Sequence, residues 1–180
     1  MPAVAKPRPA ANEKVETKRA TALREPARIV AHFDIRYRQF LDQHGKPTGD
    51  LPAFARNRDL MAKIYRHMVL TRTFDARAVS LQRTGQLGTF PSSLGQEAAM
   101  VGLAAAMHDD DVLLGTYREQ GAQLWRGVSL VELFRYWGGN ESGTNYAVPR
   151  EDFPPSIPIA THTLHAVGVA TAMKLRKQQR

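Results

Sequence analysis

Cysteine is absent from this chain of 180 residues. Its absence excludes a disulfide framework, a thiolate nucleophile and every zinc or iron–sulfur site that is built on cysteine. Long apolar runs are also missing, because no stretch approaches the roughly 20 residues that a membrane-spanning helix needs. The first twenty residues, MPAVAKPRPAANEKVETKRA, contain no apolar segment of the kind that a secretory signal requires. We therefore expect a cytoplasmic protein without a membrane partner.

Recognisable catalytic signatures are scarce. No glycine-rich phosphate loop of the P-loop or Rossmann type occurs, and no serine nucleophile elbow occurs. His162 and His165 are three residues apart on a predicted helix, a spacing that metal-binding histidines sometimes have. No third potential ligand occurs at a sequence spacing typical of zinc sites, so the pattern does not favour zinc. The more ordinary interpretation is two imidazoles on a helix.

Acidic residues are too few to balance the basic ones, and the net charge is +8. The excess lies at the two ends, with +4 in residues 1–28 and +4 from the basic residues of 174–180, while residues 29–173 are neutral. A basic groove on the folded body is therefore not supported. We interpret the charged ends as solvated segments and expect no nucleic acid partner.

Composition divides the chain into three parts. Residues 1–28, rich in Ala, Pro, Lys, Arg and Glu, are expected to form a disordered basic arm. Residues 29–56 are expected to form an extended segment, in which Phe33, Ile35 and Tyr37 alternate as in a short strand and HGKPTG supplies a turn. Residues 57–180 are expected to form the folded domain.

A long helix is predicted from Asn57, its N-cap, to Gly85. The apolar stripe on one face of this helix becomes polar at Thr71 and Asp75. Two interpretations of these polar residues remain open: they face a partner or a wet site, or they bond to neighbouring backbone or to an arginine such as Arg72.

Further helices are predicted after two capping-box spacings, Ser93 with Gln96 and Ser129 with Glu132. Between them, the apolar run VLLG predicts a buried strand. A last helix, with small residues throughout its middle, is predicted after residue 160. The alternation of strands with thin helices favours an α/β fold in which helices flank a parallel sheet.

Two stretches are candidate binding sites. In GTYREQG, Tyr117 and Arg118 follow the predicted strand, at the edge of the sheet where ligands bind in α/β folds. The guanidinium of Arg118, the hydroxyl of Tyr117 and the start of the next helix suit an anionic, phosphate-bearing ligand. The alternative is a surface ion pair of Arg118 with Glu119 or Asp111. In PPSIPIATH, the prolines free backbone carbonyls near Ser156 for a ligand or a cation, and the alternative is a plain proline-rich entry to a helix.

Taken together, these stretches resemble a known family. LGQEAAMVGLAAAM, DDDVLLGTYREQG, SIPIATHTLHAVGVATAMKLR and the helix containing MVLTRTFDARAVSLQRTGQLG occur in the order and at the separations found in the alpha subunit of the thiamine-diphosphate-dependent decarboxylating component of 2-oxo acid dehydrogenase complexes. The resemblance extends from about Phe33 to Arg176. It implies the thiamine-diphosphate-binding fold, of which residues 57–180 would be the N-terminal part.

The resemblance also implies roles for individual residues. Tyr117 and Arg118 match the pair that contacts the diphosphate, and the main chain of Ile157 and Ile159 matches the positions that hold the aminopyrimidine. A monovalent-cation site, usually potassium, is implied at Ser156, Pro158, Thr161 and His162, although the family commonly has Gln at the last position. In addition, we assign Phe90 as a residue that lines the substrate entrance, the alternative being that an aromatic residue before Pro91 packs in the core.

In such enzymes the cofactor lies between an alpha and a beta subunit of an α2β2 heterotetramer. The reaction decarboxylates pyruvate or a branched-chain 2-oxo acid and passes the acyl group to a lipoyl domain of the acyltransferase core. None of the catalytic bases is expected in this chain. The Mg²⁺ ligands of the family follow in a Gly-Asp-Gly strand and a later Asn, which would lie beyond Arg180, so residues 1–180 alone are expected to be inactive.

A second class of function is a catalytically silent, truncated relative that acts as a subunit-interaction module. Continuation of the reading frame into a Gly-Asp-Gly strand would favour the enzyme subunit, and a stop codon would favour the module. The sequence does not choose between pyruvate and branched-chain substrates.

Overall fold

The structure, a computed structural model, describes residues 28–149 and 151–178. The chain divides into two units, Met1–Asp50 and Leu51–Arg180, and each is described by itself. The disordered arm predicted for residues 1–28 lies outside the described residues except for its last position. Within the described part, no helix is both long and apolar enough to cross a membrane.

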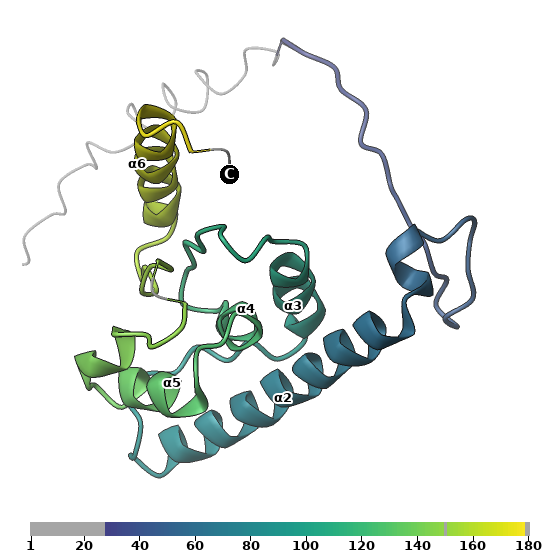
Figure 1. Ribbon diagram of the computed structural model, residues 1–180. Helices are drawn as coiled ribbons and strands as arrows, with labels where there is room; N and C mark the ends of the chain where they lie inside the picture. The colour runs from purple at the N-terminus through teal and green to yellow at the C-terminus, as the bar shows by residue number, and fades with distance from the viewer. Residues whose placement is uncertain (1–27, 150, 179–180) are drawn as a thin grey trace, which may run out of the picture. The chain divides into compact units, whose positions relative to one another are not determined.

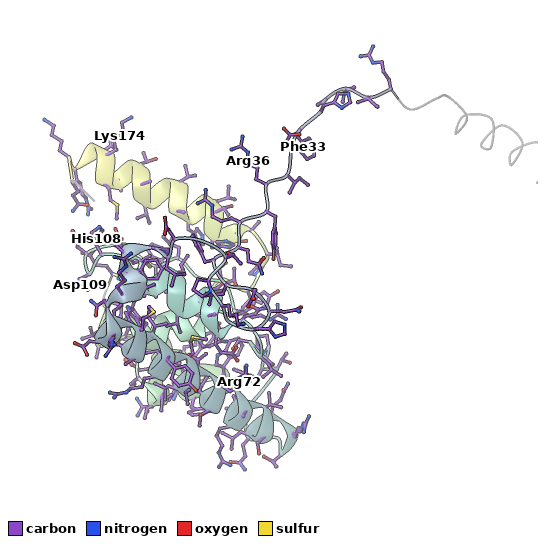
Figure 2. All side chains as sticks on the ribbon, turned by 90° about the vertical axis from the view of Figure 1, so that its right-hand side faces the viewer. Phe33, Arg36, Arg72, His108, Asp109 and Lys174 are labelled. Carbon is purple, nitrogen blue, oxygen red and sulfur yellow. The ribbon has the colours of Figure 1, made fainter. Side chains whose placement is uncertain are left out.

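The described part of the first unit is extended and ends in a turn. Asp42 Oδ1 accepts hydrogen bonds of 2.8 Å from the backbone N–H groups of His44 and Lys46. An isolated antiparallel bridge joins Leu41 to Pro47, so the turn predicted in HGKPTG is confirmed. The strand predicted around Phe33 is wrong: its apolar side chains are at least 80% exposed and its backbone pairs with no neighbouring strand in the described segment (Figure 2).

The second unit is built from helices. A short 3₁₀ helix, η1 (Ala53–Arg56), precedes the long helix α2 (Arg58–Arg83), whose N-cap Asn57 accepts a bond from the N–H of Leu60 as predicted (Figure 1). The elements that follow are α3 (Glu97–Ala105), α4 (Gln120–Trp125), α5 (Leu130–Trp137), η2 (Glu141–Thr144) and α6 (Thr161–Leu175). Helices α2, α3 and α4 pack against one another, and α5 packs against η2.

The main core is a cluster rich in aromatic residues, to which α2 and α5 both contribute side chains. Phe74 of α2 makes an edge contact with Phe90, at 5.8 Å between ring centroids, and Phe90 makes another with Trp137, at 5.4 Å. Leu133 of α5 is fully buried beside them. This cluster fixes α5 against α2 and holds the loop that contains Phe90 between them.

The predicted parallel sheet is not confirmed in residues 28–149 and 151–178. The stretch 112–115, predicted as a strand, belongs to no strand ladder among the described residues. Its backbone carbonyls at Leu113 and Gly115 accept only separate bonds, from the N–H groups of Phe153 (2.9 Å) and Ser156 (3.1 Å). A sheet needs a continuous row of such bonds to an adjacent strand, and the described residues provide a loop instead.

The two predicted capping boxes have different outcomes. At α5, Ser129 Oγ accepts from the N–H of Glu132 while the Glu132 carboxylate accepts from the N–H of Ser129, so this box is confirmed. At α3 the prediction is wrong, because the Ser93 hydroxyl donates to Asp75 of α2 instead of capping the helix. Gln96 is the N-cap of α3 instead, and its side chain makes no capping bond.

Candidate functional site

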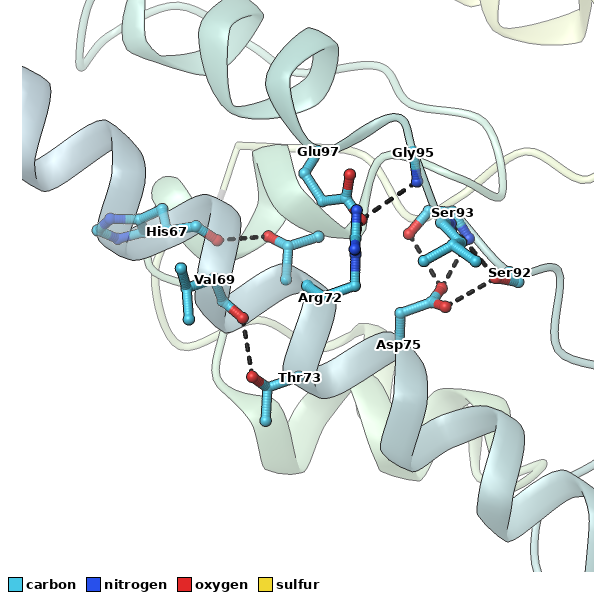
Figure 3. A network of polar contacts seen from close by, with 11 residues as sticks. His67, Val69, Arg72, Thr73, Asp75, Ser92, Ser93, Gly95 and Glu97 are labelled. Carbon is cyan, nitrogen blue, oxygen red and sulfur yellow. Dashed lines mark hydrogen bonds and ion pairs between the residues drawn. The ribbon is translucent and has the colours of Figure 1, made fainter.

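A polar network ties the loop before α3 to the middle of α2 (Figure 3). Asp75 accepts from Ser92 Oγ (2.7 Å) and from the N–H of Ser93 (2.6 Å). Thr71 Oγ donates to the carbonyl of His67, one turn earlier. The polar end of the α2 stripe therefore bonds to local backbone and to this loop, and Asp75 takes no ion pair from Arg72.

Arg72 pairs instead with Glu97 at the start of α3 (Figure 3). The Glu97 carboxylate also accepts from the N–H of Gly95 at 3.2 Å, and its side chain is almost fully buried. The hydrogen bond from Arg72 is the main cause that lowers the pKa of Glu97 from 4.5 to about 2. The carboxylate is therefore charged at neutral pH and holds α3 to α2.

The network continues into the first candidate site through Arg118. Its Nε donates to the carbonyl of Ser92 (3.2 Å), and its guanidinium carbon lies 4.9 Å from the centre of the Tyr117 ring. Nη1 donates to the Tyr117 hydroxyl at 3.4 Å. These contacts orient the guanidinium, and the described residues provide no carboxylate that forms an ion pair with it. The alternative of a surface pair with Glu119 or Asp111 is not observed.

The helix start beside Arg118 differs from the expectation. Helix α4 has only six residues, and Glu119 occupies the position before it. Glu119 Oε2 accepts from Thr116 Oγ (2.6 Å) and from the N–H of Arg118 (3.2 Å). Because a carboxylate already takes these donors, an anion at this turn depends on the side chains of Tyr117 and Arg118 rather than on the helix start.

The second candidate stretch is held beside the first by a buried ion pair. Arg126 Nε donates to Asp152 Oδ2 at 2.6 Å, and the two side chains are 6% and 2% exposed. Arg126 also donates to the carbonyls of His108 and Asp111, while Asp152 Oδ1 accepts from the N–H of Leu113 at 2.8 Å. The pair therefore fixes the start of the 152–160 loop against Leu113.

The loop then turns sharply into α6. Ile157 and Ile159 are 50% and 81% exposed, so both residues lie at the surface of the described chain. Ala160 has φ of 69°, a left-handed conformation that costs a non-glycine residue about 1 kcal/mol and here starts the helix.

The residues proposed for a monovalent cation lie at this turn. The carbonyl of Pro158 accepts a bond from the N–H of Thr161 at 3.2 Å. His162 Nδ1 is buried and has no hydrogen-bond partner in the described part of the chain. An orphaned, buried nitrogen is compatible with a role as ligand for its neutral form. Among the described residues no three His, Asp or Glu side chains gather as a metal cluster.

A cavity of about 670 Å³ joins the two candidate stretches. Tyr117 contributes to its lining from the first stretch and Ile157 from the second. The remaining lining comes from the loop before α3 and from the end of α5 with η2: Gly88, Thr89, Pro91, Tyr136, Trp137, Gly138, Gly139 and Glu141. Arg118, Ile159 and the four cation candidates are not part of this lining.

Phe90 lies in the core rather than at an entrance. Its side chain is 5% exposed and packs between Phe74 and Trp137, although its neighbours Thr89 and Pro91 line the cavity. Packing was the more ordinary role for an aromatic residue before proline, and the structure places Phe90 in that role.

Sequence reasoning missed the contribution of α5 and the Arg126–Asp152 pair. Tyr136 and Trp137 precede two glycines, a pattern that predicts the end of a helix. This pattern does not indicate that the two aromatic residues line a cavity. Arg126 and Asp152 are 26 residues apart, and their pairing depends on how the loop folds back. An acidic residue before a proline-rich loop was the only available signal.

Comparison with known proteins gives a consistent result. The family model described as "Dehydrogenase E1 component" matches residues 65–180. Pyruvate dehydrogenase E1 component subunit alpha of Acholeplasma laidlawii is 37% identical over 136 residues, which are 76% of this chain and 39% of that protein. The 3-methyl-2-oxobutanoate dehydrogenase subunit alpha of Mycobacterium tuberculosis is 36% identical over 155 residues, covering 83% and 41%. The chain thus spans about two fifths of the length of these relatives.

Proposed function

Because this chain belongs to the dehydrogenase E1 component family, we propose that it serves as part of the alpha subunit of a 2-oxo acid dehydrogenase. The reaction would be the oxidative decarboxylation of pyruvate or a branched-chain 2-oxo acid, with transfer of the acyl group to a lipoyl domain. Its cofactor would be thiamine diphosphate. One observation carries the proposal: Tyr117 and Ile157, from two stretches 40 residues apart, line the same cavity.

The residues present fit an anionic cofactor at one wall. Arg118 is oriented by Ser92 and Tyr117 and is free of a competing ion pair with any described carboxylate. A planar guanidinium donates well to phosphate oxygens, so Arg118 would bind the diphosphate while the Tyr117 hydroxyl positions it.

In the second stretch, backbone groups of Ile157 and Ile159 would hold the aminopyrimidine; Ile157 lines the cavity and Ile159 is exposed two residues further on. The bond from the N–H of Ser156 to the carbonyl of Gly115 keeps the two walls together. When bound, thiamine diphosphate would supply the electron sink for decarboxylation, and the protein would supply binding, orientation and electrostatics.

The proposed site would also hold two cations, potassium and Mg²⁺. Ser156, Pro158, Thr161 and His162 would hold potassium, which is supported by the orphaned Nδ1 of His162. Mg²⁺ would accompany the diphosphate, and we assign it no ligand among the described residues.

The proposed partners are a beta subunit, in an α2β2 heterotetramer, and a lipoyl-bearing acyltransferase core, in the cytoplasm. The exposed apolar side chains of α6 support a partner, because Leu164 and Val167 are 74% and 66% exposed in the chain alone. Burial of such side chains in an assembly would be favourable.

Arg118→Ala tests the proposal. The chain is co-purified with the beta subunit that accompanies one of the relatives named above, and binding of thiamine diphosphate with Mg²⁺ is measured by calorimetry. Loss of a hydrogen-bonded charge should weaken binding by about ten- to a hundredfold. Arg118→Lys should recover part of the affinity.

Arg135→Ala is the matched control, because it removes the same charge from an exposed residue of α5 that belongs to neither candidate stretch. It should leave binding within about twofold, as expected for a screened surface charge. Equal affinities for the wild-type complex and Arg118→Ala would contradict the proposed function.

A further inference from the structure

The apolar side chains of the segment 29–38 have no partner within the described chain. Phe33, Ile35 and Tyr37 are 80%, 86% and 85% exposed. Figure 2 shows Phe33 and Arg36 on this segment, which is neither helical nor turned. The segment also forms no backbone hydrogen bond within the described residues. Extended backbone with free N–H and C=O groups and a row of apolar side chains is a template for pairing with another strand.

Alternation sorts these side chains onto two faces. Successive side chains of an extended strand point to opposite sides, so Phe33, Ile35 and Tyr37 share one face. Asp34 and Arg36 lie on the other face. The alternation does not produce a strand inside one chain, because the described residues place no strand beside this segment. It does suit a strand that forms between two chains.

The segment is complementary to itself in one antiparallel register. When Ile35 lies opposite Ile35 of a second copy, Phe33 lies opposite Tyr37 and Asp34 lies opposite Arg36. The two-fold axis repeats these contacts, so the register contains two aromatic pairs and two pairs of opposite charge. Cross-strand pairs of both kinds stabilise antiparallel strands, and like charges directly opposite destabilise them.

The other simple registers lack this match. A parallel, in-register pair would place Asp34 opposite Asp34 and Arg36 opposite Arg36. If one antiparallel strand slides by two residues, either Asp34 or Arg36 again lies opposite its own copy. A slip by one residue places apolar side chains opposite charged ones. The charges therefore favour a second copy of this chain as the partner, in the register centred on Ile35.

We propose that two copies of this chain pair through residues 32–38 as antiparallel strands, with Ile35 on the two-fold axis. The contact goes beyond the proposed cofactor site, because it uses only the first unit. The outermost pair, His32 with Arg38, adds no opposite charge, so the specificity comes from the inner charged pairs. A short two-stranded ribbon is marginal by itself in water, so a weak association that rises with protein concentration is expected.

The absence of cysteine allows a direct test of the register. Ile35→Cys introduces one thiol per chain, and the two thiols would lie across the axis. Directly opposite residues of antiparallel strands have Cα atoms about 4.5–5.5 Å apart, a distance that a disulfide spans. Gln39→Cys is the matched control: Gln39 is exposed, yet in this register its two copies lie about 27 Å apart.

Both full-length variants are oxidised with copper phenanthroline at several protein concentrations, and the disulfide-linked dimer is followed by non-reducing electrophoresis. Ile35→Cys should form the dimer at least about ten times faster than Gln39→Cys, because pairing raises the effective concentration of its thiol. Circular dichroism checks that the helices of the second unit are unchanged. Equal rates for the two variants would overturn the inference, since they would reflect collision without a preferred register.

Exchange of the two charges tests the pairing without a cross-link. Asp34→Arg and Arg36→Asp each replace both attractive pairs by like charges, so each should weaken self-association by about tenfold or more in analytical ultracentrifugation. An equimolar mixture of these variants restores both pairs between unlike chains and should associate as the wild-type chain does. Asp50→Arg, the same change at an exposed residue outside the segment, should leave self-association within about twofold.

Three outcomes of the charge exchange would exclude the second copy as the partner of this segment. One is a wild-type chain that stays monomeric at every concentration. Another is a mixture that associates as weakly as the single variants. The third is a loss in Asp50→Arg equal to that in Asp34→Arg, which would indicate long-range repulsion instead of pairing. None of these results bears on the cofactor site, which Arg118→Ala tests separately.

Discussion

The body of the second unit and helix α6 are both rich in apolar residues, yet they use them in opposite ways. In the body, Phe74, Phe90 and Trp137 are at most 9% exposed and form one aromatic cluster. In α6 no residue is buried, and Leu175 is 78% exposed. Apolar composition alone therefore does not determine burial: α5 is amphipathic and buries its apolar face within the unit, whereas the apolar side chains of α6 stay exposed in the chain alone.

The largest contrast is expected from truncating one large side chain in each region. Phe74→Ala should lower the free energy of unfolding by about 4 kcal/mol, because it leaves a cavity among aromatic rings. Val167→Ala in α6 should change it by less than about 0.5 kcal/mol, since Val167 is mostly exposed. Urea denaturation measures both, and similar losses would show that α6 is packed as the body is.

The junction between the two regions is tested at the buried ion pair. Asp152→Asn should cost about 3 kcal/mol, because Arg126 would remain buried without its counter-charge. Thermal unfolding followed by circular dichroism measures the loss. Asp109→Asn serves as control: Asp109 is exposed and should be neutral within about 0.5 kcal/mol. An Asp152→Asn protein as stable as the control would mean that the pair does not fasten the loop to the body.

Two glycine-to-alanine substitutions compare a tightly packed position in the body with an open position in α6. A Cβ at Gly143 would lie 2.4 Å from the N of Tyr136 and 2.5 Å from the carbonyl of Glu132, so Gly143→Ala should cost about 2 kcal/mol. In α6, Gly168→Ala meets nothing within 4 Å and should increase helix content by stabilising that helix by about 0.5–1 kcal/mol. Urea melts and far-ultraviolet circular dichroism distinguish these effects. A destabilising Gly168→Ala would reveal a close neighbour of α6.

The smallest effect is expected from acid. The pKa of Glu97 lies below its ordinary value, so its contribution to stability is complete above pH 4.5 and is lost as the pH falls toward about 2. Because the Arg72 side chain is 53% exposed, water and salt weaken the pair. The unfolding midpoint of the body should fall over this range, and the fall should be smaller in Glu97→Gln. Identical pH profiles for both proteins would exclude Glu97 as the source.

The helices of the body were predictable because their signals are local. Asn57 caps α2, and Ser129 and Glu132 cap α5, through bonds between residues three apart. The predicted cap at Ser93 is wrong because Asp75, 18 positions earlier, accepts from both the N–H and the hydroxyl of Ser93, and α3 starts after Gln96. The sheet was inferred from an apolar run, which indicates burial but does not specify a hydrogen-bonding neighbour.

The sequence also singled out two stretches that the fold brings together, and the roles of their residues stay predictions. Tyr117 and Ile157 stand in recognisable stretches, and the structure places both in one cavity. Trp137 and the Arg126–Asp152 pair could not be anticipated, since their roles arise from contacts between distant segments. Residues whose role comes from a motif can be found in a sequence, whereas residues whose role comes from tertiary proximity need coordinates.

Glu132 shows how two hydrogen bonds restrict the side chains that one position can accept. One of its oxygens completes the capping box of α5, and the other accepts from the N–H of Ala147 at 2.9 Å. Glutamine would offer a single acceptor oxygen, and aspartate is one carbon shorter, so neither can serve both bonds. In a library that randomises this position and selects for folding, glutamate should be recovered far more often than its closest chemical neighbours.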